Sequence, residues 1–427
     1  MKFFSSKLKK LVSVVLAVML VFVGVLPATG CVASAQNADM TQMEFVTAED
    51  NSASFFEKAR DFIINLFEEI IAAITFRYPN LRTSPKTGKW YRVTDNGMKT
   101  SEGDKYRAFF KKGTENKVMI YFAGGGVSVN EETAREDTYN TKEVAVDMLA
   151  NATMNMGGIA SDIEGSPFAD WSFILFPYAT GDFHAGTGEF RYIDKDGKEK
   201  ILYHNGYNNY TLAMQKIMKH GGIEDADTVL VTGYSAGGWA AALLADDVYT
   251  NYFPNASNKN VLVDSAMALY DQWHDVAVNV WMTPKDISDK LISNNATMDC
   301  LYSLRQKYGN DIKLLYCTST RDGDLSKIQN YFLNGIMDVD ESVADEYQQT
   351  LKDAIPLFKQ AGVSLFIFDG VSYYDDPRNM TSHTIIATPA VWVPFEIQEQ
   401  SVAGWLSDAI NGEEKDYGVD LVNKVYS

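Results

Sequence analysis

The chain has 427 residues, of which 46% are hydrophobic, so it is long enough to fold around a substantial core and is not an intrinsically disordered protein. Its formal net charge of −18 at pH 7 argues against binding to nucleic acid or anionic lipid through its overall electrostatic field. Beyond the N-terminal leader, no apolar run reaches the roughly 18 residues that a membrane-spanning helix requires, so we expect a soluble or lipid-tethered protein.

Residues 1–35 are predicted to be a secretory signal peptide. Several lysines precede a continuous apolar run from Leu11 to Leu26, which is the order of a charged region and a hydrophobic region in such signals. The segment Ala33-Ser34-Ala35 is a typical cleavage site, and we favour release of the protein after Ala35 to the outside of the cell. The alternative is a surface lipoprotein anchored through Cys31, because Ala28-Thr29-Gly30-Cys31 resembles a bacterial lipobox, although Leu is more usual than Ala at the first of these positions.

Residues 36–85 are predicted to form a linker and an amphipathic helix. Ser54-Phe55-Phe56-Glu57 is a capping-box sequence, and apolar residues follow it at helical spacing as far as Ile74. The polar face of this helix carries acidic residues as well as Lys58 and Arg60, so we expect it to pack on the following domain rather than to lie on a membrane.

Residues 86–427 are predicted to form one α/β domain. Short apolar strands alternate with helical segments, a pattern that predicts a mostly parallel, doubly wound sheet with helices on both faces. An opening hairpin (90–93 and 106–111) is followed by buried strands at 118–122, 172–176, 228–232, 261–263, 312–317 and 363–368. Sheets of this kind carry their functional sites just beyond the carboxyl ends of the strands.

Three consecutive glycines, Gly124 to Gly126, follow the first buried strand. Glycines let the backbone turn so that N–H groups face a developing negative charge without obstruction by side chains, which is how an oxyanion hole is built. We predict Gly125 and Gly126 as oxyanion-hole donors. A plain flexible turn is an alternative, and a phosphate-binding loop is disfavoured because no Gly-Lys-Ser/Thr follows.

The segment Gly233-Tyr234-Ser235-Ala236-Gly237 lies between a β-branched apolar run and an Ala/Leu-rich helical pattern. This context of strand, sharp turn and helix is typical of a nucleophile elbow, in which a strained serine is lifted out of the fold. We therefore predict Ser235 as a nucleophile and the N–H of Ala236 as a further oxyanion donor. The alternative is an ordinary turn between a strand and a helix.

A serine nucleophile requires a histidine base and a carboxylate that orients it. Of the five histidines, His383 follows the last predicted strand and is our candidate for the base. Asp322 follows the preceding strand, and the order Ser235, Asp322, His383 is that of an α/β-hydrolase triad. Asp324 and Asp264 are alternative acids, although Asp264 could instead cap the next helix.

Cys300 and Cys317 are the two cysteines beyond the leader, so at most one disulfide is possible and it remains open whether the two pair. Buried, inert thiols are the commoner outcome for a cysteine such as Cys317 in an apolar strand. Asp322-Gly323-Asp324 is a weak match to a calcium loop, and neither a His-Glu-x-x-His run nor a paired-cysteine cluster occurs. We therefore expect no metal and no cofactor.

Taken together, these segments resemble the pectin acetylesterase and Notum family of α/β-hydrolases. The resemblance covers roughly residues 86–400. The segments in the family's order are the triple glycine, Pro177-Tyr178-x-x-Gly181-Asp182 with nearby His184, His204-x-Gly206, Gly-x-Ser-Ala-Gly-Gly, Asp264-Ser265 and the late Asp322 and His383.

The resemblance implies a serine carboxylesterase with Ser235, Asp322 and His383 as its triad, and we expect Asp182 and His184 to bind substrate. Family members commonly carry Trp and Cys after the glycines, where this chain has Val127 and Ser128, which indicates a divergent bacterial-type member. The activity that we predict is hydrolysis of O-acetyl groups on a polysaccharide through an acyl-enzyme. The alternatives are a deacylase of longer acyl chains, as in the Notum branch, and a non-catalytic surface protein built on a hydrolase fold.

Overall fold

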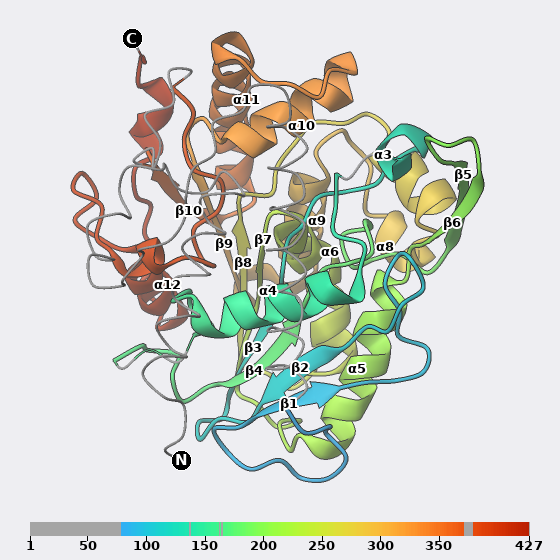
Figure 1. The fold of residues 1–427 in the computed structure, drawn as a ribbon. Coiled ribbons are helices and arrows are strands. Elements are labelled where there is room, and N and C mark those ends of the chain that lie inside the picture. The colour runs from blue at the N-terminus through green and yellow to red at the C-terminus, as the bar shows by residue number, and fades with distance from the viewer. Residues whose placement is uncertain (1–77, 136–137, 162, 164, 371–378, 427) are drawn as a thin grey trace, which may run out of the picture.

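The computed structural model describes residues 78–426 except 136–137, 162, 164 and 371–378 (Figure 1). The predicted signal peptide, the lipobox cysteine and the predicted amphipathic helix therefore lie outside the described residues. Within the described residues, no helix combines the length and the apolar character needed to cross a bilayer.

An eight-stranded sheet forms the centre of the molecule, in the order β1-β2-β4-β3-β7-β8-β9-β10 (Figure 1). The strands β1 and β2 pair antiparallel, as do β2 and β4, and all other neighbours are parallel. The predicted opening hairpin and the mostly parallel sheet are thus confirmed. The strand bounds are β1 Trp90–Val93, β2 Ala108–Lys111, β3 Lys117–Phe122, β4 Ser172–Phe176, β7 Thr228–Tyr234, β8 Asn258–Asp264, β9 Ile312–Ser319 and β10 Val363–Phe368.

Helices cover both faces of the sheet (Figure 1). Successive residues of each buried strand point to opposite sides, so apolar side chains on both faces must be covered, and each face carries its own hydrophobic core. In β3, Ile120 and Phe122 contribute to one hydrophobic core, and Met119 and Tyr121 contribute to the other. The first core is closed by α5 Gly206–His220, α6 Ala236–Asn251, α9 Ala296–Tyr308, α10 Gly323–Asn334 and α11 Glu341–Gln360, and the second by α4 Glu143–Asn155, α12 Val402–Ile410 and η4 Pro389–Trp392. The doubly wound architecture is therefore confirmed.

Short elements decorate the connections between the strands. They are α3 Glu131–Arg135, α7 Trp273–Asp275, the π-helical turn η2 Val276–Val280, α8 Lys285–Ser288, η3 Gly309–Asp311 and η5 Val419–Asn423. The structure adds a separate hairpin, β5 Glu189–Ile193 and β6 Glu199–Tyr203, to the strands that the sequence predicts. Its residues are mostly exposed or half-buried, so the apolar alternation that indicates a strand packed on a core is weak.

Both described cysteines, Cys300 and Cys317, are buried free thiols. Burial raises the pKa of Cys300 to about 12, and it raises the pKa of Cys317 well above its ordinary value. Cys317 lies in the middle of the sheet, and Cys300 lies in α9 over the opposite core. The two residues therefore act as packing groups rather than as a disulfide.

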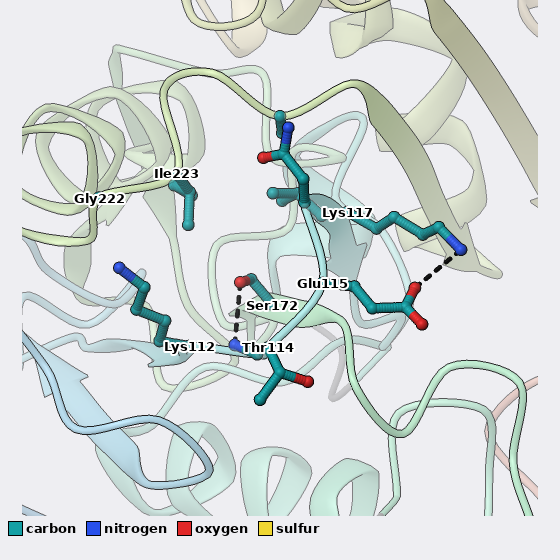
Figure 2. A pocket seen from close by; sticks show the side chains of 11 residues that line it. Lys112, Thr114, Glu115, Lys117, Ser172, Gly222 and Ile223 are labelled. Carbon is teal, nitrogen blue, oxygen red and sulfur yellow. Dashed lines mark hydrogen bonds and ion pairs between the residues drawn. The ribbon is translucent and has the colours of Figure 1, made fainter.

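A hollow of about 190 Å³ opens at the edge of the sheet where the parallel strands β3 and β4 begin (Figure 2). It is lined by residues 112–118 together with Ser172, Gly222, Ile223 and Ala226. Residues at the carboxyl ends of the strands, including Ser235, lie at the opposite edge. This hollow is consequently not the place where the predicted triad residues meet.

Candidate active site

The register of the central strands brings the predicted site residues to one edge of the sheet. Phe122 at the end of β3 pairs with Gly233, Tyr234 at the end of β7 pairs with Asp264, and Asp264 in turn pairs with Cys317 of β9. The glycine loop, Ser235 and the loop that carries Asp322 therefore leave the sheet side by side, as the strand-end rule for parallel sheets predicts.

Ser235 occupies a strained turn between β7 and α6. Its φ of 54° and ψ of −129° are unusual for a residue with a side chain, and the residue is half-buried. Gly233 and Gly237 make this turn possible. A Cβ on Gly233 would lie 2.2 Å from the carbonyl oxygen of Gly237, and a Cβ on Gly237 would lie 2.0 Å from that of Phe122. Only glycine fits at either position. The backbone geometry of this turn is therefore that of the predicted nucleophile elbow.

The triple-glycine loop packs directly against this elbow. A Cβ on Gly124 would lie 2.7 Å from the Cβ of Ser235 and 2.4 Å from the carbonyl oxygen of Tyr234. Gly126 has a φ of 86°, which favours glycine, and it pairs with Tyr139 in an isolated bridge. The carbonyl oxygen of Gly125 accepts the N–H of Asn140 at 3.0 Å. The loop is thus held from its far side while its near side faces Ser235.

His383 and Asp322 form a hydrogen-bonded pair. Nδ1 of His383 lies 2.9 Å from Oδ1 and 2.8 Å from Oδ2 of Asp322, whose side chain is fully buried. Oδ1 of Asp322 also accepts the backbone N–H groups of Asp324 and Leu325 at the start of α10. Since a carboxylate only accepts, Nδ1 carries the proton in the neutral form of His383, and Nε2 is then free to accept one.

The two alternative acids have other positions. Asp324 is exposed on the first turn of α10. The carboxylate of Asp264 is buried and accepts backbone N–H groups of Ile385 and Ile386, so it neither pairs with the imidazole nor caps a helix.

The Ser235 hydroxyl makes no hydrogen bond to His383 within the described part of the chain, and catalytic contacts of this kind are often long before substrate binds.

Three carboxylates control the protonation of His383. Burial by itself would lower the pKa of the imidazole, but the charge of Asp322 and its hydrogen bond, with smaller contributions from Asp324 and Asp264, raise the pKa to about 9. Positive charge on His383 is therefore favoured at neutral pH. A histidine that must accept a proton works only in its neutral form.

The raised pKa of His383 leads to a testable expectation for the ester hydrolysis that the sequence predicts. Because the pKa of His383 is raised, we expect kcat/KM to increase with rising pH through the alkaline range instead of levelling off near the ordinary histidine value of about 6.5. The variant Asp324→Asn removes one exposed carboxylate and should move the rising limb to lower pH by about a few tenths of a unit. Asp311→Asn, at the opposite end of β9, is the control and should leave the limb in place. A limb that stays fixed in Asp324→Asn contradicts this account.

The structure places the side chains of Asp182 and His184, which we expect to bind substrate, inside the protein. Their side chains are 0% and 2% exposed. The Asp182 carboxylate accepts the Thr180 hydroxyl and the backbone N–H groups of His184, Gly186 and Gly206. Every one of these contacts lies within the protein, so Asp182 stabilises the turn after β4.

His184 supports the glycine loop. Its Nε2 donates to the carbonyl oxygen of Ala123 at 3.0 Å, one residue before Gly124, and burial lowers its pKa to about 4, so the ring is neutral. Both Phe183 and His184 have positive φ values, 50° and 57°, which turn the His184 side chain inward. The two residues that we predicted to contact substrate therefore hold the loop that faces Ser235.

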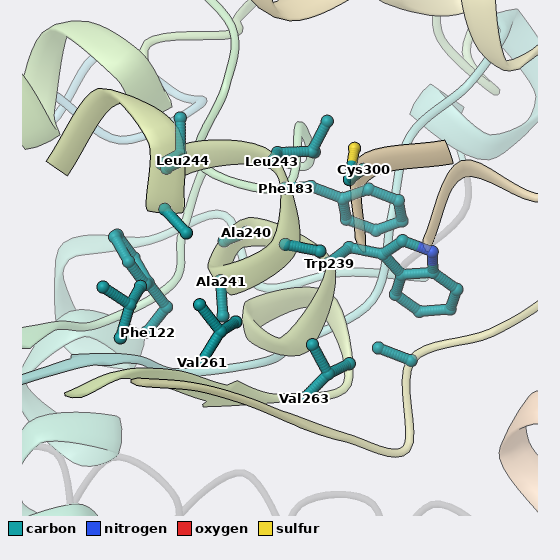
Figure 3. Close-up of a cluster of buried hydrophobic side chains, with 14 of the residues drawn as sticks. Phe122, Phe183, Trp239, Ala240, Ala241, Leu243, Leu244, Val261, Val263 and Cys300 are labelled. Carbon is teal, nitrogen blue, oxygen red and sulfur yellow. The ribbon is translucent and has the colours of Figure 1, made fainter. Parts of the chain in front are cut away.

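An aromatic cluster beside the elbow was not predicted. Trp239, one helical turn beyond Ser235, stacks on Phe183 with ring centroids 4.7 Å apart and an interplanar angle of 2° (Figure 3). Trp273 and Trp281, from the connection between β8 and α9, pack against the same phenylalanine. The four rings come from three distant segments of the chain, so no local sequence pattern indicates that they meet.

Residues 102–297 match the model of the family described as pectinacetylesterase. The search of curated proteins found no match. Among solved structures, that of the Wnt deacylase Notum from Drosophila is similar, with a TM-score of 0.50 and 13% sequence identity over 75% of this chain and 92% of that chain. At this level of identity the likeness to Notum concerns the fold.

The matched residues 102–297 include the glycine loop, the turn that holds Asp182 and His184, and the Ser235 elbow. The mostly parallel central sheet is similar to the α/β-hydrolase-like fold of Notum. Residues 102–297 thus match the pectinacetylesterase family and the fold is similar to that of Notum, and the two findings together support a place for the chain in the pectinacetylesterase and Notum family.

Proposed function

We propose that the protein is an exported serine carboxylesterase that removes acetyl groups from a hydroxylated polymer through an acyl-enzyme on Ser235. The observation that supports this most strongly is the arrangement at one sheet edge: Gly124 packs against Ser235, and His383 pairs with the buried Asp322 on the neighbouring loops. Export is inferred from the predicted leader sequence.

In the proposed mechanism, Nε2 of His383 accepts the proton of the Ser235 hydroxyl as Oγ attacks the ester carbonyl carbon. The N–H groups of Gly125, Gly126 and Ala236 stabilise the oxyanion that forms. The C–O bond to the alcohol then breaks, and the alcohol leaves with the proton from His383. A water molecule, deprotonated by His383, attacks the acyl carbon, and the acid leaves as Ser235 recovers its proton. Asp322 keeps the imidazole in one tautomer and stabilises its positive charge.

The packing beside Ser235 favours a short acyl group. Trp239 is 4% exposed and lies against Phe183, so long side chains already fill the volume on this side of the elbow. An acetyl group needs little further space, whereas a fatty acyl chain needs a deep apolar cavity. The strongly negative net charge disfavours highly charged pectate and is compatible with acetylated xylan or partly esterified pectin.

The acyl preference can be measured with acetyl and octanoyl esters of p-nitrophenol. We expect kcat/KM for the acetyl ester to exceed that for the octanoyl ester by about 10-fold or more, because the packed rings resist a long chain. A preference for octanoate would support the second candidate, a Notum-like deacylase.

Acetate release is then assayed on acetylated xylan and acetylated pectin, and the absence of release from every acetylated polysaccharide tested would remove the proposed substrate class.

A further inference from the structure

Three consecutive backbone N–H groups immediately after His383 are bound by two side chains of another strand end. The N–H of Thr384 donates to Oγ of Ser265 at 3.3 Å. The N–H groups of Ile385 and Ile386 donate to Oδ2 of Asp264 at 2.7 Å and 2.9 Å. Successive N–H groups that converge on one anion fix the path of a loop more firmly than a single contact does.

The same aspartate is bonded to the nucleophile turn. The main-chain carbonyl oxygen of Asp264 accepts the N–H of Ser235 at 2.9 Å. Its other carboxylate oxygen, Oδ1, accepts the hydroxyl of Ser265 at 3.0 Å. One residue at the end of β8 thus contacts both the residue proposed to attack the ester and the loop that carries the proposed base.

The burial and the backbone strain at Asp264 and Ser265 are energetically unfavourable, so these contacts between the Ser235 turn and the His383 loop carry a free-energy cost. Both side chains are fully buried, and burial raises the pKa of Asp264 to about 6 despite the hydrogen bonds that favour its charged form. Ser265 and Thr384, which meet at this point, have φ values of 49° and 61°. A buried carboxylate and two strained residues persist only where the surroundings hold them, and such strain concentrates at functional sites.

The side of the loop before His383 has a separate anchor. The N–H of Thr381 donates to the carbonyl oxygen of Arg321, and the N–H of Gly323 donates to the carbonyl oxygen of Thr381. Those contacts, with the Asp322 carboxylate, orient the ring. They leave the distance between the His383 loop and the Ser235 turn to be set by the contacts on the other side.

We propose that Asp264, assisted by Ser265, is a positioning residue that holds the loop after His383 against the Ser235 turn and so keeps Nε2 within reach of the nucleophile. This inference rests on the proposed function, because it assigns Asp264 a part in the proton transfer from Ser235. It makes Asp264 neither the triad acid nor a group that touches substrate.

The test is the variant Asp264→Asn, which keeps the size of the side chain but turns an acceptor of several N–H groups into an amide with one acceptor oxygen. We expect kcat for p-nitrophenyl acetate to fall by about 10- to 100-fold with KM changed by less than about 2-fold, since a displacement of about 1 Å has such an effect on catalysis. Hydrogen–deuterium exchange of the 384–386 amides should become at least about 10-fold faster.

Asp247→Asn is the matched control. Asp247 is also a buried aspartate, but its carboxylate accepts the Tyr207 and Tyr210 hydroxyls and the Asn251 amide, between α5 and α6. This variant should lose stability while keeping kcat and the slow exchange of the 384–386 amides. Should Asp264→Asn fail to fold, Ser265→Ala removes the Thr384 contact alone among the three, and a smaller fall in kcat, of about 3- to 10-fold, is expected.

The two measurements separate the failure of this inference from the failure of the proposed function. Wild-type activity with unchanged kcat in folded Asp264→Asn overturns the positioning role, and so does exchange of the 384–386 amides at the wild-type rate. If the wild-type protein hydrolyses no ester, the proposed function fails, and the positioning role, which presupposes it, is overturned with it; faster exchange in Asp264→Asn would then establish only a structural anchor.

Discussion

Replacement of Ser235 by alanine is expected to lower kcat/KM for p-nitrophenyl acetate by about 10⁴-fold or more, because removal of a triad nucleophile eliminates the acyl-enzyme route. The fold should tolerate this change. Ser235 is half-buried, and its unusual φ of 54° is equally strained for serine and alanine. Stopped-flow or steady-state release of p-nitrophenol measures the loss, and the thermal unfolding midpoint verifies that the variant is folded.

The control for Ser235→Ala is Ser257→Ala, at an exposed position before β8. It should behave as wild type in both assays, which excludes losses that arise from purification or handling. Equal activity of wild type and Ser235→Ala would mean that the elbow does not act on simple esters. The alternative of a non-catalytic protein on a hydrolase fold would then become the better interpretation.

The variant Gly124→Ala is expected to lower kcat by about 10³-fold, with a smaller change in stability. The added methyl group would lie 2.7 Å from the Cβ of Ser235 and 2.4 Å from the carbonyl oxygen of Tyr234, so the loop or the elbow must move. Loss of a single oxyanion donor typically costs about 10²- to 10³-fold, and movement of the loop displaces the N–H groups of both Gly125 and Gly126. Activity on p-nitrophenyl acetate, measured beside circular dichroism, checks this expectation.

Gly412→Ala provides the comparison for the glycine loop. This exposed glycine has a φ of 98°, and a Cβ there would meet nothing within 4 Å, so the substitution adds backbone strain but no collision. A modest loss of stability of about 1 kcal/mol with unchanged kcat is expected. If Gly124→Ala retains activity comparable with that of Gly412→Ala, the loop does not contribute to the oxyanion hole.

Much of the fold could be predicted from the sequence because the central strands are buried on both faces. Runs such as Val118–Phe122, and Val363–Phe368 in which Ser364 alone is polar, are separated by helical segments, which is the pattern of a parallel sheet covered on both sides. The β5–β6 hairpin lacks that signal because water reaches most of its side chains.

The candidate site was predictable at the level of strand ends and less so at the level of side-chain direction. Chain order and the strand pattern indicated Ser235, Asp322 and His383, and the structure brings the latter two into contact. The sequence did not separate Asp322 from Asp324, because both follow the same strand. In the structure, α10 begins at Gly323, which leaves Asp322 buried and paired with His383 and leaves Asp324 exposed.

The positions of Asp182 and His184 depend on backbone conformations that residue types alone do not reveal. Both lie at a strand end, where substrate-binding residues are common, but the positive φ values of Phe183 and His184 turn the imidazole toward Ala123. The role of Asp264 is hidden for a related reason. Its partners, Ile385 and Ile386, are more than a hundred residues away, and the contacts involve their backbone, so their side chains carry no signal.

The most direct test of the central claim is to identify the residue that reacts with a fluorophosphonate, a reagent that phosphonylates activated serine hydroxyls. Intact-mass measurement and peptide mapping should find one adduct per chain, on Ser235, and the labelling rate should fall by at least about 10³-fold in His383→Ala. An adduct on a different residue, or labelling of Ser235 at the same rate in His383→Ala, would contradict the proposal that His383 activates Ser235 as the nucleophile.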